Sequence, residues 1–319
     1  MWWNNVESKP WGFYPLGWDV RLMELLGPAR WRNGRYEGKT IFEAIPAGEM
    51  ALGVLPEEED WAHPNLGEDE IAGGEIQAGD YLHGTHRVWN FYLQRICNHC
   101  SYPACAGACP RKAIYKRPED GIVLIDQERC RGYQECVKCC PYKKSMFHAP
   151  SRRSQKCIAC YPAVGQGHQT QCVVNCIGKI RIFGFINPPD KVREDNPIDY
   201  LVHVARIAKP LYPQFGTQPN VYYIPPIHVP MNFLGQMFGP GVPEAVELYR
   251  TARDNKILAG LLVLFGCTDR IIGRFRVSGD QAIGYDRTGS EIVRVPVREP
   301  IFVRSFFDEK HRAYRHSVT

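Results

Sequence analysis

Cysteines are concentrated in one part of this chain, where they fall into three spaced groups. Twelve of the thirteen cysteines lie between Cys97 and Cys176. Cysteine sulfur binds iron–sulfur clusters and zinc, and a two-cluster ferredoxin motif consists of closely spaced cysteines that end in a Cys-Pro pair. Two of the groups end in such a pair. The groups are Cys97, Cys100, Cys105 and Cys109; Cys130, Cys136 and Cys140; and Cys157, Cys160, Cys172 and Cys176.

The first two groups predict two clusters that exchange ligands. In a two-cluster ferredoxin, three closely spaced cysteines bind one cluster, and the cysteine before proline binds the other cluster. This rule gives one [4Fe-4S] cluster the ligands Cys97, Cys100, Cys105 and Cys140. It leaves the neighbouring cluster with three ligands, which are Cys109, Cys130 and Cys136.

Tyr133 stands where the second group would carry its missing cysteine. A phenol with an ordinary pKa of about 10 is a poor ligand for cluster iron. We therefore predict a [3Fe-4S] cluster at this site. Two alternatives stay open: a water or hydroxide on a fourth iron, or ligation by Cys139, which the assignment leaves unused.

The third group has no complementary group in the chain. Cys157, Cys160 and Cys172 are predicted to bind another [4Fe-4S] cluster whose fourth ligand is absent from the sequence. Cys176 would then bind a further [4Fe-4S] cluster whose other ligands are also absent. The alternative for this group alone is a structural zinc site with four cysteine ligands.

The nearby histidines and the thirteenth cysteine are not predicted to be iron ligands. No catalytic residue is predicted. His99 lies between two predicted ligands, and His148 and His168 lie close by in the sequence. Each is expected to donate a hydrogen bond to sulfur or to face solvent. Cys267 stands alone in an apolar stretch, so we expect it to be a core residue.

The composition is that of a folded globular protein, with 319 residues of which 44% are hydrophobic and 23% charged. The longest apolar run, 257–266, is about half of the roughly 20 residues that span a bilayer, so no membrane span is predicted.

Residues 95–183 carry 15 Lys and Arg against 5 Asp and Glu. Cations stabilise negatively charged clusters, and we prefer this explanation to nucleic-acid binding. A disulfide scaffold is not expected in a chain of this length.

Short elements must position the cysteines. A strand is predicted over 88–96, and the segments 113–116 and 121–125 flank a turn typical of a β-hairpin. Short helices are expected to follow the third cysteine of each group. These elements predict an α+β protein with a ferredoxin-like double-cluster core.

The rest of the chain is expected to surround that core. Residues 1–90 are predicted to be an irregular N-terminal flank with one helix near 19–26, 91–185 the iron–sulfur domain, and 186–319 a C-terminal extension for subunit contacts. Within the extension, the expected features are helices over 196–208 and 243–267, an irregular surface stretch over 210–230, and two or three strands over 271–303.

Several segments carry a family resemblance. They are FYLQRICNHCSYPACAGACPRKAIYKRPEDGIVLIDQERCRGY from Phe91, CPYKK from Cys140, KCIACYP from Lys156, CIGKIR from Cys176, PLYPQFGTQPNVYYIPP from Pro210, QMFGPGV from Gln236 and EPIFVR from Glu299. With these segments the chain resembles the iron–sulfur β subunit of the respiratory molybdoenzymes of the nitrate reductase and nitrite oxidoreductase class. The resemblance is greatest to the nitrite oxidoreductase branch.

The resemblance implies an electron-transfer subunit without a substrate site of its own. In that family the β subunit relays single electrons through [4Fe-4S] clusters and one [3Fe-4S] cluster. The implied partners are a catalytic α subunit that carries molybdenum bis-pterin and a haem-bearing γ subunit or cytochrome. The family also has an aromatic residue at the position of Tyr133, and its ligand sets match those assigned above.

The resemblance also makes predictions about the start of the chain and its location. The family has a further group of four cysteines before a segment like the one that begins at Met1, so we expect Met1 to be an internal methionine. The expected location is a membrane-associated complex on the periplasmic side, with the cytoplasmic side as the alternative. The competing functions are an electron carrier or redox sensor without a molybdenum partner, and a zinc-stabilised binding protein.

Overall fold

The computed structural model describes residues 5–9, 26–32, 35–44, 91–227, 229, 231–297, 303–308 and 313–318. Apart from Leu26, the helix expected near 19–26 lies outside these residues. The described residues form two compact units, each built from two segments. The first unit combines Met1–Cys157 with Lys209–Pro243, and the second combines Ile158–Ala208 with Glu244–Thr319. The predicted division at residues 90 and 185 stays a prediction.

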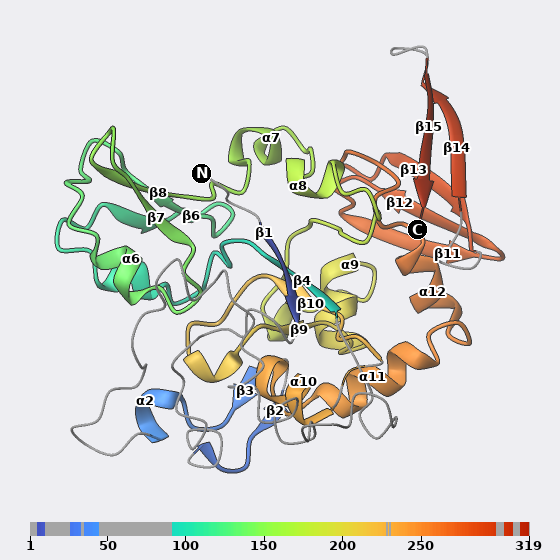
Figure 1. Ribbon diagram of the computed structural model, residues 1–319. Coiled ribbons are helices and arrows are strands. Elements are labelled where there is room, and N and C mark those ends of the chain that lie inside the picture. Colours follow the sequence, from blue (N-terminus) through green and yellow to red (C-terminus); the bar gives the residue numbers. More distant parts are fainter. Residues whose placement is uncertain are drawn as a thin grey trace, which may run out of the picture. The chain divides into compact units, whose positions relative to one another are not determined.

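The first unit consists of small antiparallel sheets and short helices (Figure 1). Its paired strands are β1 (Asn5–Lys9) with β4 (Phe91–Arg95), β2 (Arg30–Arg32) with β3 (Arg35–Glu37), β5 (Ile114–Lys116) with β6 (Val123–Ile125), β7 (Ser145–His148) with β8 (Arg153–Lys156), and β9 (Lys209–Pro210) with β10 (Tyr222–Tyr223). Its helices are α2 (Ile41–Ala44), α5 (Ala104–Gly107), α6 (Glu135–Cys139), the 3-10 helix η4 (Pro213–Phe215) and α10 (Met231–Phe238).

The predicted hairpin is confirmed, and it holds the cysteine-bearing helices together. In β5 and β6, Ile114 pairs with Ile125. The amide of Gly121 donates a hydrogen bond to the carbonyl of Arg117 at 2.9 Å and so closes the turn. The buried side chains of Ile114 and Val123 pack with Cys136 of α6, and Cys105 of α5 packs on the same cluster. Short helices are present, but they contain Cys105, Cys136 and Cys172 instead of following the third cysteine of each group as predicted: these helices are α5, α6 and α8 (Gln171–Val174).

The N-terminal flank is not irregular where the structure describes it. Asn5 pairs with Arg95 and Lys9 with Phe91, so β1 lies along the strand that leads into the first cysteine group. The predicted strand is confirmed for Phe91–Arg95. The expectation of an irregular flank is therefore wrong for the described residues of β1, β2, β3 and α2.

The stretch expected to cross a surface without structure forms part of the core of the first unit. Leu211, Tyr212 and Phe215 are each 2% exposed, and they pack in a segment that contains β9, η4 and β10. The Phe215 ring contacts Tyr142 edge-on, with centroids 5.4 Å apart. The prolines suggested a segment without regular structure at the surface. Burial of the large apolar side chains between them is favourable, and this places the segment in the core.

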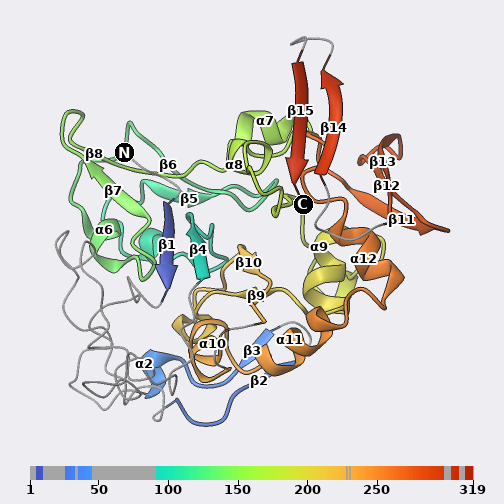
Figure 2. The ribbon, with the colours of Figure 1, turned by 45° about the vertical axis from the view of Figure 1, so that its right-hand side comes forward.

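The second unit combines a three-stranded antiparallel sheet with short helices (Figure 2). The sheet order is β11 (Arg274–Ser278), β12 (Gln281–Tyr285) and β13 (Glu291–Pro296), which confirms the expected strands, and β14 (Val303–Asp308) pairs with β15 (Ala313–Val318). The helices are α7 (Tyr161–Gly165), α8, η2 (Pro189–Lys191), α9 (Pro197–Asp199), the π-helix η3 (Tyr200–Val204), most of α11 (Val242–Arg250) and α12 (Lys256–Leu262).

Two helices of this unit differ from their predicted extents. Asn196 caps α9 as expected, but the following turn is a π-helix that ends at Val204 rather than near residue 208. The helix predicted over 243–267 is two helices. Asn255 accepts from the amides of Ile257 and Leu258 and so starts α12 as a new helix, which explains the break.

Candidate functional site

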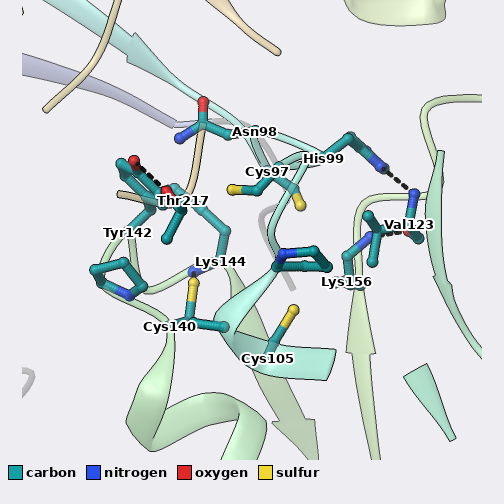
Figure 3. A pocket seen from close by; sticks show the side chains of 14 residues that line it. Cys97, Asn98, His99, Cys105, Val123, Cys140, Tyr142, Lys144, Lys156 and Thr217 are labelled. Atoms are coloured by element: carbon teal, nitrogen blue, oxygen red, sulfur yellow. Dashed lines mark hydrogen bonds between the residues drawn. The ribbon is translucent and has the colours of Figure 1, made fainter. Parts of the chain in front are cut away.

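Four predicted ligands line one cavity in the first unit, here called the first cavity. It is drawn in Figure 3. The cysteines that line it are Cys97, Cys100, Cys105 and Cys140. In Figure 3 the sulfurs of Cys105 and Cys140 point toward the loop that carries Cys97. Helix α5 supplies Cys105, and Cys140 directly follows the last residue of α6. The elements thus bring together the cysteines that spacing assigned to one [4Fe-4S] cluster.

The sulfurs of the first cavity are poorly suited to remain charged on their own. Burial, and then the neighbouring Cys97, raises the pKa of the Cys100 thiol to about 12. Burial also raises the pKa of Cys105, with a further contribution from Cys140. Ligands must be deprotonated to bind a metal, so closely spaced buried thiols become thiolates when a cationic centre compensates their charge. This donor set fits an iron–sulfur cluster.

Buried polar groups surround these sulfurs. Lys144 and Lys156 are each 5% exposed, and both line the first cavity. The amide of Lys144 donates to Cys140 Sγ at 3.4 Å. The Lys156 ammonium donates to the carbonyl oxygens of Val123 and Cys157. Positive charge near the sulfurs favours the anionic state of a bound cluster.

His99 is buried and does not face solvent. Its Nδ1 accepts a hydrogen bond from the Val123 amide at 3.1 Å (Figure 3). Burial, and then the positive charge of Lys156, lowers the pKa of His99 to about 3, so the ring is neutral. The other two histidines have different partners. His148 Nδ1 lies 2.8 Å from Ser151 Oγ, and His168 Nδ1 lies 3.5 Å from a carboxylate oxygen of Asp269.

A segment from far along the chain covers the first cysteine loop, and reasoning from cysteine spacing missed it. Thr217 lines the first cavity, and its hydroxyl lies 2.8 Å from Tyr142 Oη. The Asn220 amide group donates to the carbonyl of His99 at 2.8 Å and to Ser101 Oγ at 3.3 Å. The signal that could have found these residues is the segment PLYPQFGTQPN, which carries family resemblance without any cysteine.

The second cavity brings together the three ligands predicted for the other cluster. Its lining includes Cys109, Cys130 and Cys136. Two backbone amides donate to these sulfurs: Ala113 to Cys109 and Ser154 to Cys130, both at 3.3 Å.

Tyr133 also lines the second cavity, at the position predicted to lack a ligand. The tyrosine is 60% exposed, so this side of the cavity lies at the surface of the unit. The preceding Gly132 has φ +69°, and a Cβ there would overlap the carbonyl oxygen of Arg152. Glycine is therefore required for the loop to pass this close to its neighbour.

Cys139 contributes to the lining of neither cavity. It lies in α6 and is half-buried. Burial, and then the adjacent Cys140 and Cys136, raises the pKa of its thiol to about 12. Because Cys139 lies outside the lining of the second cavity, it is poorly placed to supply the ligand that is missing at the position of Tyr133.

The third group is divided between the two units. Cys157 ends the first segment of the first unit, and Cys160, Cys172 and Cys176 belong to the second unit. Cys172 Sγ lies 3.3 Å from Thr170 Oγ1. The predicted ligand sets that contain these four cysteines stay predictions.

Cys267 is half-buried, and its thiol donates to the Val263 carbonyl at 2.9 Å. The prediction that Cys267 is a core residue is therefore only partly correct.

Within the described part of the chain, no three His, Cys, Asp or Glu side chains are arranged to bind a single metal ion.

Comparison with known proteins agrees with this geometry. Residues 88–186 match the family model of the 4Fe-4S dicluster domain. The selenate reductase subunit beta of Thauera selenatis is 40% identical over 301 residues, which cover 85% of this chain and 87% of that protein. The chlorate reductase subunit beta of Ideonella dechloratans is 40% identical over 302 residues, with coverage of 85% and 87%. The respiratory nitrate reductase subunit beta of Haloferax mediterranei is 35% identical over 303 residues, with coverage of 80% and 77%.

A dicluster domain whose cysteines line two cavities defines a class of iron–sulfur electron-transfer proteins. Within that class, the chain belongs to the iron–sulfur β subunits of the type II molybdoenzymes. It is an electron-transfer subunit, and catalysis in this family lies on the α subunit.

Proposed function

We propose that this chain relays single electrons between a molybdenum bis-pterin α subunit and a haem-bearing γ subunit, cytochrome or other electron partner. The observation that carries the proposal is the convergence of Cys97, Cys100, Cys105 and Cys140 on the first cavity. A cluster bound there supplies one-electron redox chemistry. The chain's own residues provide thiolate ligands, exclude water by burial, and direct backbone amides at sulfur.

We further propose that the second cavity holds a [3Fe-4S] cluster bound by Cys109, Cys130 and Cys136. The support is that Tyr133 lines this cavity where a fourth cysteine would be required. Cys157, Cys160 and Cys172 are proposed to be three ligands of a further [4Fe-4S] cluster. Cys176 is proposed to be one ligand of another [4Fe-4S] cluster. The remaining ligands are proposed to come from outside this sequence.

The substrate of the partner is proposed to be an oxyanion of the nitrate and nitrite class, with the nitrite oxidoreductase branch as the specific assignment. The three relatives described above belong, by their names, to reductases of selenate, chlorate and nitrate, which are oxyanions. We propose a membrane-associated complex on the periplasmic side. No helix among the described residues is long and apolar enough to cross a membrane.

Metal analysis of the complex, purified without oxygen, tests the proposal. Iron, acid-labile sulfide, zinc and molybdenum are measured per chain, together with the mass of this subunit and of the proteins that stay bound to it. About 15 irons are expected for three [4Fe-4S] clusters and one [3Fe-4S] cluster, and about 7 if the first and second cavities alone are filled.

Three other results would contradict the proposal. Zinc without sulfide would identify a zinc-stabilised binding protein. Iron and sulfide in a chain that retains no molybdenum-containing partner would identify a free electron carrier or redox sensor. A sample without iron, sulfide or zinc would exclude the cluster assignment altogether.

A further inference from the structure

Strand β8 contributes to the lining of both cavities. Its side chains alternate between half-buried and buried positions, and Ser154 and Lys156 share the buried face. Ser154 lines the second cavity, whereas Lys156 lines the first. The buried face of one strand therefore provides polar groups to both of the proposed cluster sites.

The hydroxyl of Ser154 is buried without a partner. Ser154 is 1% exposed, and among the residues that the structure describes its Oγ forms no hydrogen bond. The backbone of the same residue is satisfied, because its amide donates to Cys130 Sγ at 3.3 Å and its carbonyl accepts from Gln127 Nε2 at 3.0 Å. Buried hydroxyl groups normally have a partner, since an unpaired one is unfavourable, so this exception requires an explanation.

The position of Ser154 indicates what its hydroxyl binds. Its amide contacts the sulfur of Cys130, and the serine side chain is short, so Oγ stays close to this contact. An iron–sulfur cluster presents sulfurs that accept hydrogen bonds. A serine hydroxyl always carries a proton that it can donate. The unpaired donor and the acceptors of the proposed cluster therefore match in chemistry and in place.

We propose that Ser154 Oγ donates a hydrogen bond to a sulfur of the cluster in the second cavity and thereby raises the reduction potential of that cluster. The inference rests on the proposed function, which assigns a cluster to this cavity. Reduction adds negative charge to a cluster and its ligand sulfurs, so a hydrogen-bond donor stabilises the reduced form more than the oxidised form. Ser154 then supplies two donors to one site: its amide to Cys130 Sγ and its hydroxyl to the cluster.

The neighbouring strand offers a matched comparison. Ser145 of β7 pairs with Lys156 of β8 and is 3% exposed. Its Oγ also has no hydrogen-bond partner among the described residues, but Ser145 lines neither cavity. A missing partner alone therefore does not assign a hydroxyl to a cluster. The contact with Cys130 and the place in the cavity lining distinguish Ser154 from Ser145.

Two variants of the intact complex test the inference: S154A and the control S145A. Redox titration followed by electron paramagnetic resonance gives the potential of each cluster, and iron is measured in the same samples. In S154A we expect the equilibrium constant for reduction of the second-cavity cluster to fall about fivefold, which is about 41 mV for a one-electron couple. S145A should keep the wild-type potential, because it removes a buried hydroxyl outside the cavity lining.

A second measurement detects the donated proton itself. Electron–nuclear double resonance of the paramagnetic cluster reports the protons close to it. Brief exchange into heavy water replaces a hydroxyl proton before the protons of hydrogen-bonded amides. One such rapidly exchanging proton should be coupled to the second-cavity cluster in the wild type and in S145A, and it should be absent from S154A.

The outcomes separate this inference from the proposed function. An unchanged potential in S154A at full iron content would overturn the inference, as would an equal decrease in S145A. If S154A loses its iron, the wild-type complex decides: without a rapidly exchanging proton coupled to the second-cavity cluster, the inference is wrong. A wild-type complex that binds no cluster at the second cavity would instead overturn the proposed function.

Discussion

The two cavities of the first unit share one scaffold but differ in what surrounds their sulfurs. The first is lined by four cysteines, by the buried ammonium-bearing chains of Lys144 and Lys156, and by the hydroxyl of Thr217. The second is lined by three cysteines and by Tyr133, which is 60% exposed. Cluster potentials depend on charge, hydrogen bonds to sulfur and solvent exposure. One repeated motif can therefore give two electron-transfer sites of different potential.

The difference arises from the segments that cover each cavity. Residues 217–220 lie beside the first, where Asn220 and Thr217 bond to the cysteine loop. Strand β8 contributes to the second, where the Ser154 amide donates to Cys130. The predicted ligands of both cavities come from the cysteine groups, and residues outside these groups, such as Thr217 and Ser154, complete the lining.

Removal of Cys140 is expected to have the largest effect. Cys140→Ala should cost the first cavity its cluster, with a loss of about four irons per chain, while the second cavity keeps its paramagnetic signal. Metal analysis and electron paramagnetic resonance of the purified complex measure both. The matched control is Cys139→Ala, one residue away and in the lining of neither cavity, which should keep all its iron. Equal iron loss in both variants would contradict the assignment.

Tyr133→Cys should make the two cavities more alike. The exposed position tolerates the smaller side chain, and a fourth thiolate at the second cavity should convert its three-iron cluster to a four-iron cluster of lower potential. The gain is about one iron per chain, and the paramagnetic signal of the oxidised three-iron cluster should disappear. Persistence of that signal in the variant would show that residue 133 does not face the missing iron position.

Lys156→Met should reduce the electrostatic contrast between the cavities. Loss of a buried positive charge in the lining of the first cavity is expected to lower the equilibrium constant for reduction of its cluster about threefold. Lys138→Met is the control, because Lys138 is exposed and paired with Glu135 at 3.1 Å. Redox titration of both variants provides the measurement. If this equilibrium constant decreased only for the cluster of the second cavity, the prediction would be wrong, because Lys156 would then act on the second cavity.

The grouping of cysteines was predictable because their spacing reflects local structure. The hairpin β5–β6 follows from its turn residues, and together with helices α5 and α6 it brings Cys105 and Cys136 onto one small core. The family was recognisable for the same reason. Tyr133 stood out because a phenol occupies a position where the motif requires sulfur.

The surroundings of the first cavity were not predictable from local pattern. Asn220 contacts the carbonyl of a residue 121 positions earlier, and such a contact leaves no periodic signal in either segment. The prolines of 210–230 suggested an irregular surface stretch, whereas Leu211, Tyr212 and Phe215 form part of the core. Burial of Lys156 was equally hidden, because its partners are carbonyl groups that every sequence provides.

The separation between Asn98 and Asn220 has a consequence for biosynthesis. The first cysteine loop is made early, but the residues that close over it emerge from the ribosome more than a hundred positions later. Contacts this distant form late, because the intervening chain must first be closed into a loop. We therefore expect the nascent loop to stay accessible to iron–sulfur assembly factors until residue 220 has been synthesised, so that translation itself sets the interval for loading.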